Sequence, residues 1–347
     1  MKSNNKTFTL NPVIRSLTAA CAIGGMGLAM PAHATIVDVS ASGLGQNLNV
    51  GGVRYEVIKN EVVNSPLNQL PGAGPNALGA PRGYGIDNVF YGSNQNDIFS
   101  AVGGIRVKSG SSTLDSFNQQ TNTVNITSTA AGTSVNTVSP QNINGINTSV
   151  DYFMSATSPT LRVFGSFTNT TGNEIIVDVA YGSNLGSNAN TVLQAASSGD
   201  AAFQANDRWL VSGDSTGTLP SLTFVRFGPN GQMAYATPGI PGVTSGPPYF
   251  TNSQLDYYAD MWSLTLAPGA TKNLMWFVQF NDTLNNALTG ASAFANRDSL
   301  SAAGLLAGLT LDQQFKTANW ALPEPGSLAL FGIGALAAFV ERRKRRV

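Results

Sequence analysis

The chain has 347 residues, and its 19 Lys and Arg equal its 19 Asp and Glu, so that the formal net charge is zero. Charged residues make up 11% of the sequence, against about 25% in an average soluble domain. Gly, Ser, Thr and Asn replace them, and no basic cluster outside the extreme C-terminus offers the electrostatic footprint of a nucleic-acid-binding protein.

Residues 1–34 have the pattern of a secretory signal peptide. Three cations precede the apolar segment Leu17–Met30, which is followed by a small-x-small sequence with Ala32 and Ala34 at its ends. This pattern predicts cleavage by signal peptidase, so that the mature chain begins at Thr35. A lipoprotein signal using Cys21 and an uncleaved N-terminal anchor are the alternatives.

Removal of this segment changes the chemistry available to the protein. Cys21 and His33 are the only Cys and His of the sequence, and both precede Thr35. The predicted mature chain therefore excludes disulfides, Cys or His metal sites and Ser-His-Asp triads. Between Thr35 and Leu322 there are 11 Lys and Arg and 17 Asp and Glu, so that this part carries a formal charge of −6.

Apolar side chains alternate with polar ones in many segments between residues 35 and 283, which predicts β-strands. Gly, Pro and Asn lie in the gaps and predict turns. The expected strands are Val53–Val57, Gly104–Lys108, Thr123–Thr127, Val150–Ser155, Leu161–Thr168, Ile175–Ala180, Trp209–Ser212, Leu222–Phe227, Tyr257–Leu266 and Leu274–Phe280.

Two pairs of these strands are predicted to form hairpins. In one, Asn169–Gly172 joins Leu161–Phe167 to Ile175–Ala180, and in the other Ala267–Thr271 joins Leu264–Leu266 to Leu274–Val278. The second hairpin resembles the closing strands of extracellular immunoglobulin-like or fibronectin-like sandwiches. We therefore expect residues 35–320 to form a mainly β, antiparallel domain, with a sandwich of the immunoglobulin-like or jelly-roll type.

A helical patch is predicted after the last strand. Leu284, Ala287, Leu288 and Ala291 follow helical spacing, and similar spacing continues from Leu300 to Trp320. We expect this patch to pack on the edge of the sandwich, although a helix that binds a partner is the alternative.

Candidate catalytic groups are few. Gly213–Gly217 has the form Gly-x-Ser-x-Gly, but no helix-forming segment follows and the predicted mature chain has no His, so we interpret it as a turn. Carboxylates are the remaining acid–base groups, with Asp200, Asp207 and Asp214 seven residues apart and Asp256 and Asp260 four apart. A glycosidase needs two carboxyl groups across a cleft, which spacing alone does not establish.

Oxygen ligands for a metal occur in one loop-rich stretch. Asn184, Asn188, Asp200 and Asp207 could bind Ca²⁺, but no Asp-x-Asp-x-Asp loop is present. Ordinary Asx turns are the favoured interpretation, and no cofactor is predicted.

Aromatic residues concentrate in the last third of the domain. Tyr249 and Phe250 follow two prolines in a loop and are candidates for stacking against sugar rings. Trp262 and Trp276 lie in predicted strands, where packing in the core is the expected role.

The C-terminus combines three features in order: Pro323-Glu324-Pro325, the uncharged run Gly326–Val340 and a basic end. The run has 15 residues and spans about 22 Å as a helix, less than the ~30 Å hydrocarbon core of a bilayer. Five cations after it would keep this end cytoplasmic. These cations are Arg342, Arg343, Lys344, Arg345 and Arg346.

This arrangement resembles the PEP-CTERM sorting signal of Gram-negative bacteria, which the exosortase system recognises. The resemblance covers Pro323 to Arg346 and implies an inner-membrane intermediate, processing by exosortase and a host that produces exopolysaccharide. An ordinary single-pass anchor is the alternative. The resemblance implies no particular activity for the domain before it.

These features predict three regions: a signal peptide (1–34), an extracellular β-rich domain (35–320) and a sorting segment (321–347). The expected function is that of a non-catalytic cell-surface or matrix protein, structural or glycan-binding, with exopolysaccharide as its partner. An exported hydrolase that acts on polysaccharides through Asp or Glu is the alternative.

Overall fold

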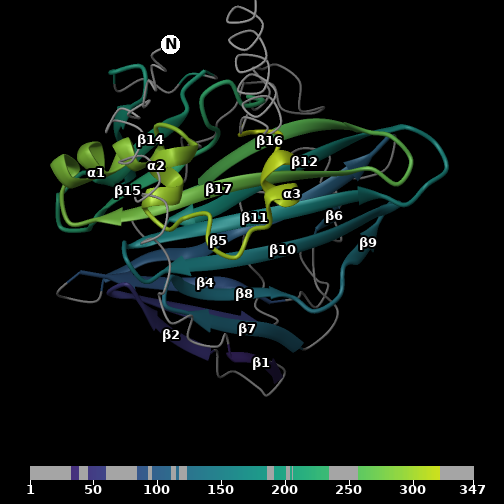
Figure 1. The fold of residues 1–347 in the computed structure, drawn as a ribbon. Coiled ribbons are helices and arrows are strands. Elements are labelled where there is room, and N and C mark those ends of the chain that lie inside the picture. Colours follow the sequence, from purple (N-terminus) through teal and green to yellow (C-terminus); the bar gives the residue numbers. More distant parts are fainter. Residues whose placement is uncertain are drawn as a thin grey trace, which may run out of the picture. The chain divides into compact units, whose positions relative to one another are not determined.

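The described part of the chain forms two antiparallel β-sheets and a group of short helices (Figure 1). The computed structural model describes residues 33–38, 46–59, 84–92, 96–110, 115–116, 123–185, 191–200, 204, 206–233 and 257–320.

The larger sheet has ten strands in the described residues, in the order β1-β7-β8-β10-β11-β17-β15-β14-β13, with β9 paired to β10. All of its pairings are antiparallel. The strands are β1 (His33–Asp38), β7 (Thr123–Thr129), β8 (Gly132–Thr137), β9 (Gln141–Ile143), β10 (Ile146–Ser155), β11 (Thr160–Asn169), β13 (Thr191–Ala196), β14 (Trp209–Asp214), β15 (Ser221–Val225) and β17 (Thr271–Asn281).

The smaller sheet has seven described strands, in the order β16-β12-β5-β4-β3-β2, with β6 paired to β5. Its pairings are also antiparallel. The strands are β2 (Gln46–Val50), β3 (Val53–Lys59), β4 (Tyr84–Tyr91), β5 (Asn96–Ser109), β6 (Asp115–Ser116), β12 (Ile175–Leu185) and β16 (Tyr257–Leu266).

All ten strands predicted from alternation are present, with bounds that differ by a few residues at most ends. The two predicted hairpins are wrong. β11 pairs with β10 and β17, whereas β12 pairs with β5 and β16 in the other sheet. Likewise β16 and β17 belong to different sheets. A short polar turn can join two strands of a hairpin or two strands that belong to different sheets. The pairing partners that decide between these arrangements are distant in sequence.

One hydrophobic core contains residues of both sheets, so that the sheets pack face to face. Trp276 on β17 stacks on Tyr181 of β12, with ring centroids 4.6 Å apart. The same indole meets Trp262 of β16 edge-on at 5.4 Å. Trp262 and Trp276 are fully buried, which confirms the core role predicted for them.

Four short helices follow the last strand, in the region where the sequence predicts helix. α1 (Leu284–Gly290), α2 (Arg297–Ala302) and α3 (Leu311–Phe315) each begin after a side-chain N-cap, and the 3-10 helix η5 (Ala291–Phe294) continues α1. Thr310 and Gln313 form a capping box at α3, which satisfies two backbone donors at the start of this single turn.

The helices cover an outer face of the ten-stranded sheet and not its edge, which corrects the prediction. Phe294, Leu300 and Leu305 pack with Val225, Met275 and Phe277 in a second apolar cluster. These sheet residues alternate with the inward-pointing residues of β15 and β17, so both faces of these central strands are buried. Figure 1 shows the helices in front of these strands, with none in front of β7 and β8.

Several predicted features lie outside the described residues or at their limits. β1 begins at His33, so that cleavage after Ala34 would leave Thr35–Asp38 to pair with β7. The sorting segment 321–347 is not among the described residues. No helix in the described part of the chain is long and apolar enough to cross a membrane.

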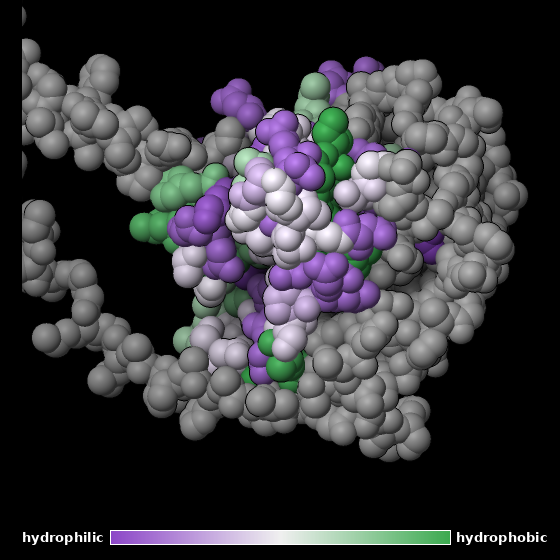
Figure 2. All heavy atoms as spheres, turned by 90° about the vertical axis from the view of Figure 1, so that its right-hand side faces the viewer, coloured by the Kyte–Doolittle hydropathy of each residue, from purple (hydrophilic) through white to green (hydrophobic). Residues whose placement is uncertain are grey.

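Figure 2 shows the face at the right of Figure 1, where the described residues are mainly white or purple. Green is limited to small separate areas. The described residues on this face are therefore mainly polar or of intermediate hydropathy, in agreement with the composition of the chain.

Candidate functional site

A groove of about 290 Å³ lies on the outer face of the ten-stranded sheet, beside the helical layer. Strands β8, β10 and β11 form its floor, and the segment before α3 together with α3 forms a wall. The lining consists of Ser134, Asn136, Thr137, Ser149, Val150, Asp151, Phe164, Ser166, Gly308, Leu309 and Gln313.

Strand register brings the polar side chains of the groove floor together. Asn136 on β8 is paired with Asp151 on β10, and Asp151 is paired with Phe164 on β11. Paired residues of antiparallel strands lie on the same face, so the three side chains form one row. Ser149 and Ser166 form the next row. We call the five polar residues on these strands the polar floor: Ser134, Asn136, Ser149, Asp151 and Ser166.

Arg162 fixes the only carboxylate of this lining. Its Nη2 donates to Asp151 Oδ2 at 2.8 Å, and the Arg162 side chain is fully buried whereas that of Asp151 is 18% exposed. Arg162 Nη1 donates to the carbonyls of Leu305 (2.7 Å) and Ala307 (2.9 Å). Burial lowers the pKa of the guanidinium, and the charge of Asp151 opposes that shift.

The remaining groups of the polar floor have no such partners. The side chains of Ser134, Asn136 and Ser149 make no hydrogen bond to the described part of the chain. Asp151 Oδ1 is buried and also lacks a partner there. A hydroxyl or amide can both donate and accept, so the polar floor can bind a ligand rich in hydroxyl groups.

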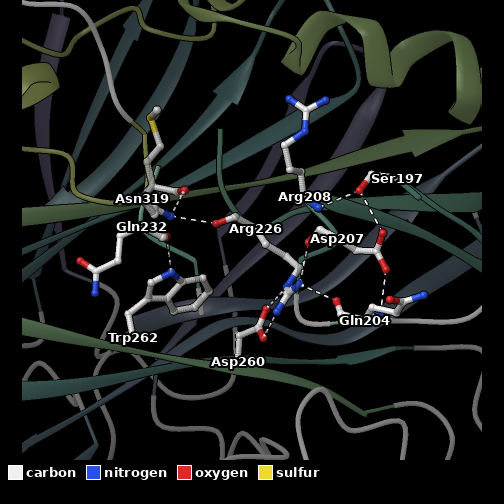
Figure 3. Close-up of polar contacts among 10 residues, drawn as sticks. Ser197, Gln204, Asp207, Arg208, Arg226, Gln232, Asp260, Trp262 and Asn319 are labelled. Carbon is white, nitrogen blue, oxygen red and sulfur yellow. Dashed lines mark hydrogen bonds and ion pairs between the residues drawn. The ribbon is translucent and has the colours of Figure 1, made fainter. Parts of the chain in front are cut away.

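A second polar cluster joins the two sheets in the interior (Figure 3). Arg226 follows β15 in one sheet and binds Asp260 on β16 of the other through both carboxylate oxygens, at 2.5 and 2.7 Å. Both side chains are fully buried. Arg226 Nη1 also donates to the carbonyl of Asp207 at 2.6 Å. Because this pair is shielded from solvent, we assign it a structural role.

Asn319 extends this cluster to the end of the helical layer. Its Nδ2 donates to the carbonyls of Arg226 and Met275, and its Oδ1 accepts from Met275 N. Nearby, Trp262 Nε1 donates to the carbonyl of Gln232 at 3.2 Å. Asn319 therefore anchors the C-terminal end of the described domain to two strands of the larger sheet.

The residues suggested as Ca²⁺ ligands either have other partners or lie outside the described residues. Asp207 is buried and accepts hydrogen bonds from Ser197 Oγ, from Ser198 N and from Gln204 N (Figure 3). Asp200 accepts one from Ser198 Oγ. Both carboxylates thus hold the β13–β14 loop. No group of three or more Asp, Glu, His or Cys within the described residues is arranged to hold a metal.

Asn188 is outside the described residues, as are the predicted stacking residues Tyr249 and Phe250 and the carboxylate Asp256. The backbone of Asn184 lies in β12, paired with Tyr257. The proposed glycan contact of Tyr249 and Phe250 therefore stays a prediction.

The turn predicted for Gly213–Gly217 is formed by its last three residues, 215–217, which follow β14 and lead toward the antiparallel strand β15, whereas Gly213 and Asp214 end β14. Asp214 accepts hydrogen bonds from the hydroxyls of Thr216 and Thr218 and from both of their backbone N–H groups. These bonds, from Thr216 first, lower the pKa of Asp214 to about 2. The role of the Asp214 carboxylate is therefore to stabilise the turn.

Asn136, Asp151 and Arg162 were not predicted from the sequence. Their signal is a polar side chain at every second position of a strand, as in Asn147, Ser149 and Asp151 on β10. This pattern marks the face turned away from the core, but it does not indicate which strand lies beside it.

Comparison with known proteins identifies the tail. Residues 321–346 match the family described as the PEP-CTERM protein-sorting motif. The chain carries a PEP-CTERM sorting motif. This match confirms the resemblance seen at Pro323–Arg346, and PEP-CTERM implies an exported protein that transits the membrane and is processed by exosortase. A search of curated proteins finds no match, and the PEP-CTERM motif assigns no family to the domain before it.

Two solved structures are similar to part of the chain. A polysaccharide lyase shows 13% identity and a TM-score of 0.38 over 70% of this chain, which spans 34% of the lyase. A galactose mutarotase-like protein from Lactobacillus casei shows 8% identity and a TM-score of 0.36, covering 68% of this chain and 100% of that protein. At these TM-scores neither likeness supports an argument about fold or activity.

Proposed function

We propose that this PEP-CTERM protein is delivered to the cell surface or extracellular matrix of a Gram-negative bacterium, where it binds exopolysaccharide without turning it over. The observation that carries the proposal is the polar floor, a row of hydroxyl, amide and carboxylate groups whose hydrogen-bonding capacity is largely unused. Sugars present hydroxyl groups that donate and accept, so they match this chemistry.

The route to the surface follows from the two ends of the chain. Signal peptidase would cut between Ala34 and Thr35, and the segment 321–347 would hold an inner-membrane intermediate until exosortase acts on Pro323–Pro325. The part that remains, 35–320, includes both sheets and the helical layer. We propose that these sheets form a sandwich of the immunoglobulin-like or jelly-roll type, since two antiparallel sheets sharing one core are what such a fold requires.

Absence of turnover is proposed because the described lining of the groove contains a single carboxylate. Hydrolysis of a glycosidic bond generally uses two carboxyl groups, roughly 5–9.5 Å apart. Asp151 is the one acidic residue in the lining, and Arg162 binds it from the sheet side. The alternative, a hydrolase that uses Asp or Glu, needs a second acid beside this groove.

Binding and turnover can be measured on the same sample. Full-length protein, in a detergent without a sugar headgroup, is mixed with host exopolysaccharide, and retention and reducing ends are recorded. We expect retention that changes little between low and high salt, because few charges line the groove. Asn136→Ala should weaken retention, whereas Asn125→Ala should not.

Asn125 is a matched control because it is paired with Asn136 on the neighbouring strand β7 and is outside the groove lining. No retention by the unmodified protein would contradict the proposal. Release of reducing ends that Asp151→Asn abolishes, in a protein that stays folded by circular dichroism, would favour the hydrolase.

A further inference from the structure

We infer that the groove on β8, β10 and β11 is selective for a neutral sugar unit and discriminates against uronates and other anionic sugars. This inference rests on the proposed glycan-binding function and adds the charge class of the ligand. It follows from how Asp151, Asn136 and Arg162 are arranged.

The charged groups of the described groove lining disfavour an anionic ligand. Asp151 is the charged residue in the lining, and its partner Arg162 is fully buried. The donors of Arg162 Nη1 are directed at the carbonyls of Leu305 and Ala307, and Nη2 is directed at Asp151. Among the lining residues that the structure describes, none has a cationic side chain. A carboxylate on a sugar would therefore meet a negative group without a cation to pair with.

The hydrogen-bonding groups fit adjacent hydroxyls of a sugar ring. Asp151 Oδ1 is buried, whereas Oδ2 accepts one hydrogen bond from Arg162 and keeps the capacity to accept a second one from a ligand. Asn136 is the direct cross-strand neighbour of Asp151, at a typical Cβ separation of about 4.5–5.5 Å. One sugar hydroxyl can donate to the carboxylate while the next accepts from the amide.

The remaining lining suits a single ring. The groove volume of about 290 Å³ is at the lower end of the range of small-molecule sites, roughly 300–1,000 Å³. Phe164 and Leu309 contribute apolar surface beside the polar floor. Sugar rings combine hydroxyl edges with C–H faces, and this lining offers a counterpart to both.

Calorimetric titration of the full-length protein tests the inference. The two probes are a neutral gluco-oligosaccharide and a uronate oligosaccharide of the same length, again without sugar-based detergent. We expect the neutral probe to bind at least about tenfold more tightly. Asn136→Ala should weaken that binding by about tenfold, the effect of one hydrogen bond, and Asn125→Ala should leave it unchanged.

Introduction of a positive charge gives a second, gain-of-function test. Asn136→Lys places a cation beside Asp151 and should move the preference toward the uronate probe. Circular dichroism and the unfolding midpoint would verify that each variant is folded.

The outcomes separate the two levels of the proposal. Tighter binding of the uronate probe by the unmodified protein would overturn the charge selectivity and leave glycan binding intact. Binding of neither probe, together with no retention on host exopolysaccharide, would overturn both. Equal loss of binding in Asn125→Ala and Asn136→Ala would also overturn the assignment of the groove.

Discussion

A hydrogen bond between Asn169 and Leu266 links the two connections that pass from one sheet to the other, from β11 to β12 and from β16 to β17. Asn169 ends β11, is fully buried, and donates from Nδ2 to the carbonyl of Leu266, the last residue of β16, at 3.0 Å. The Asn169 backbone also binds Gly269 and Ala270 in the connection after β16. Its Oδ1 accepts from Thr171 in its own connection. Asn169 thus holds both of these connections at the same end of the core.

Asn169→Asp should destabilise the domain. The carboxylate keeps the acceptor for Thr171 but loses the amide donor, and it places a negative charge beside the carbonyls of Asn173 and Leu266. We expect the free energy of unfolding in urea to fall by roughly 2–4 kcal/mol. Asn285→Asp on the exposed side of α1 is the matched change and should have little effect. Equal stability of the two variants would show that the Asn169 amide does not hold the two connections between the sheets.

Asp260→Asn should be more damaging, because it leaves the Arg226 charge buried without a counterion. Removal of one partner of a buried ion pair generally lowers stability by about 3–5 kcal/mol. The control is Asp312→Asn, which breaks the exposed pair of Asp312 with Lys316 and should change stability by about 0.5 kcal/mol or less. Chemical denaturation of both variants makes the comparison, and a small effect at Asp260 would contradict the structural role of the pair.

Asp214 predicts a specific loss of stability in acid. Its pKa is about 2 in the folded protein, below the usual 3.8, because Thr216 and Thr218 donate hydrogen bonds to it. Its contribution is therefore present above pH ~4 and is lost as the pH falls toward 2. Asp214→Asn should destabilise the protein at pH 6 and converge with the unmodified protein near pH 2.

Thr218→Val should reduce this pH dependence, because it removes one of the donors to Asp214. Ser215→Ala, in the same turn, removes a hydroxyl for which the structure shows no bond to Asp214 and should leave the dependence unchanged. Thermal unfolding between pH 2 and 6 measures both. An identical acid profile for Asp214→Asn and the unmodified protein would disprove the assignment.

Trp320 should be essential for attachment of the helical layer. It is 1% exposed, packs edge-on against Phe277 at 5.4 Å, and donates from Nε1 to the carbonyl of Met275 at 2.9 Å. Trp320→Ala should lower stability by about 3–5 kcal/mol and promote aggregation through the exposed face of the sheet. Leu311→Ala removes a side chain that is 55% exposed and should change stability by about 0.5 kcal/mol or less.

Processing can be tested on material from the producing cells. Mass analysis of the extracellular protein should give Thr35 at the N-terminus and no residues beyond the Pro323–Pro325 region. Glu324→Ala should retain the protein in the inner membrane, whereas Glu174→Ala, an exposed change in the domain, should not. Intact Arg342–Arg346 in the extracellular fraction would show that the tail is an ordinary anchor.

Alternation along the chain predicted the major strands because the direction of each side chain in a strand is a local property. β16, Tyr257–Leu266, has the bounds that were predicted. β8 was missed because Val135 is the one large apolar residue in Gly132–Thr137, which leaves almost no alternation to detect. β1 was missed because His33 and Ala34 belong to the predicted signal-cleavage site.

The sequence by itself determined that this protein is exported and processed by exosortase, because a sorting signal is a contiguous segment and the PEP-CTERM motif lies within residues 321–346. Only the tertiary structure decided which sheet each strand joins. It also paired Arg226 with Asp260 and placed Asn136 beside Asp151. These contacts join residues that are far apart along the chain, and strand register and core packing select them. The groove and its carboxylate therefore emerge only in the folded protein.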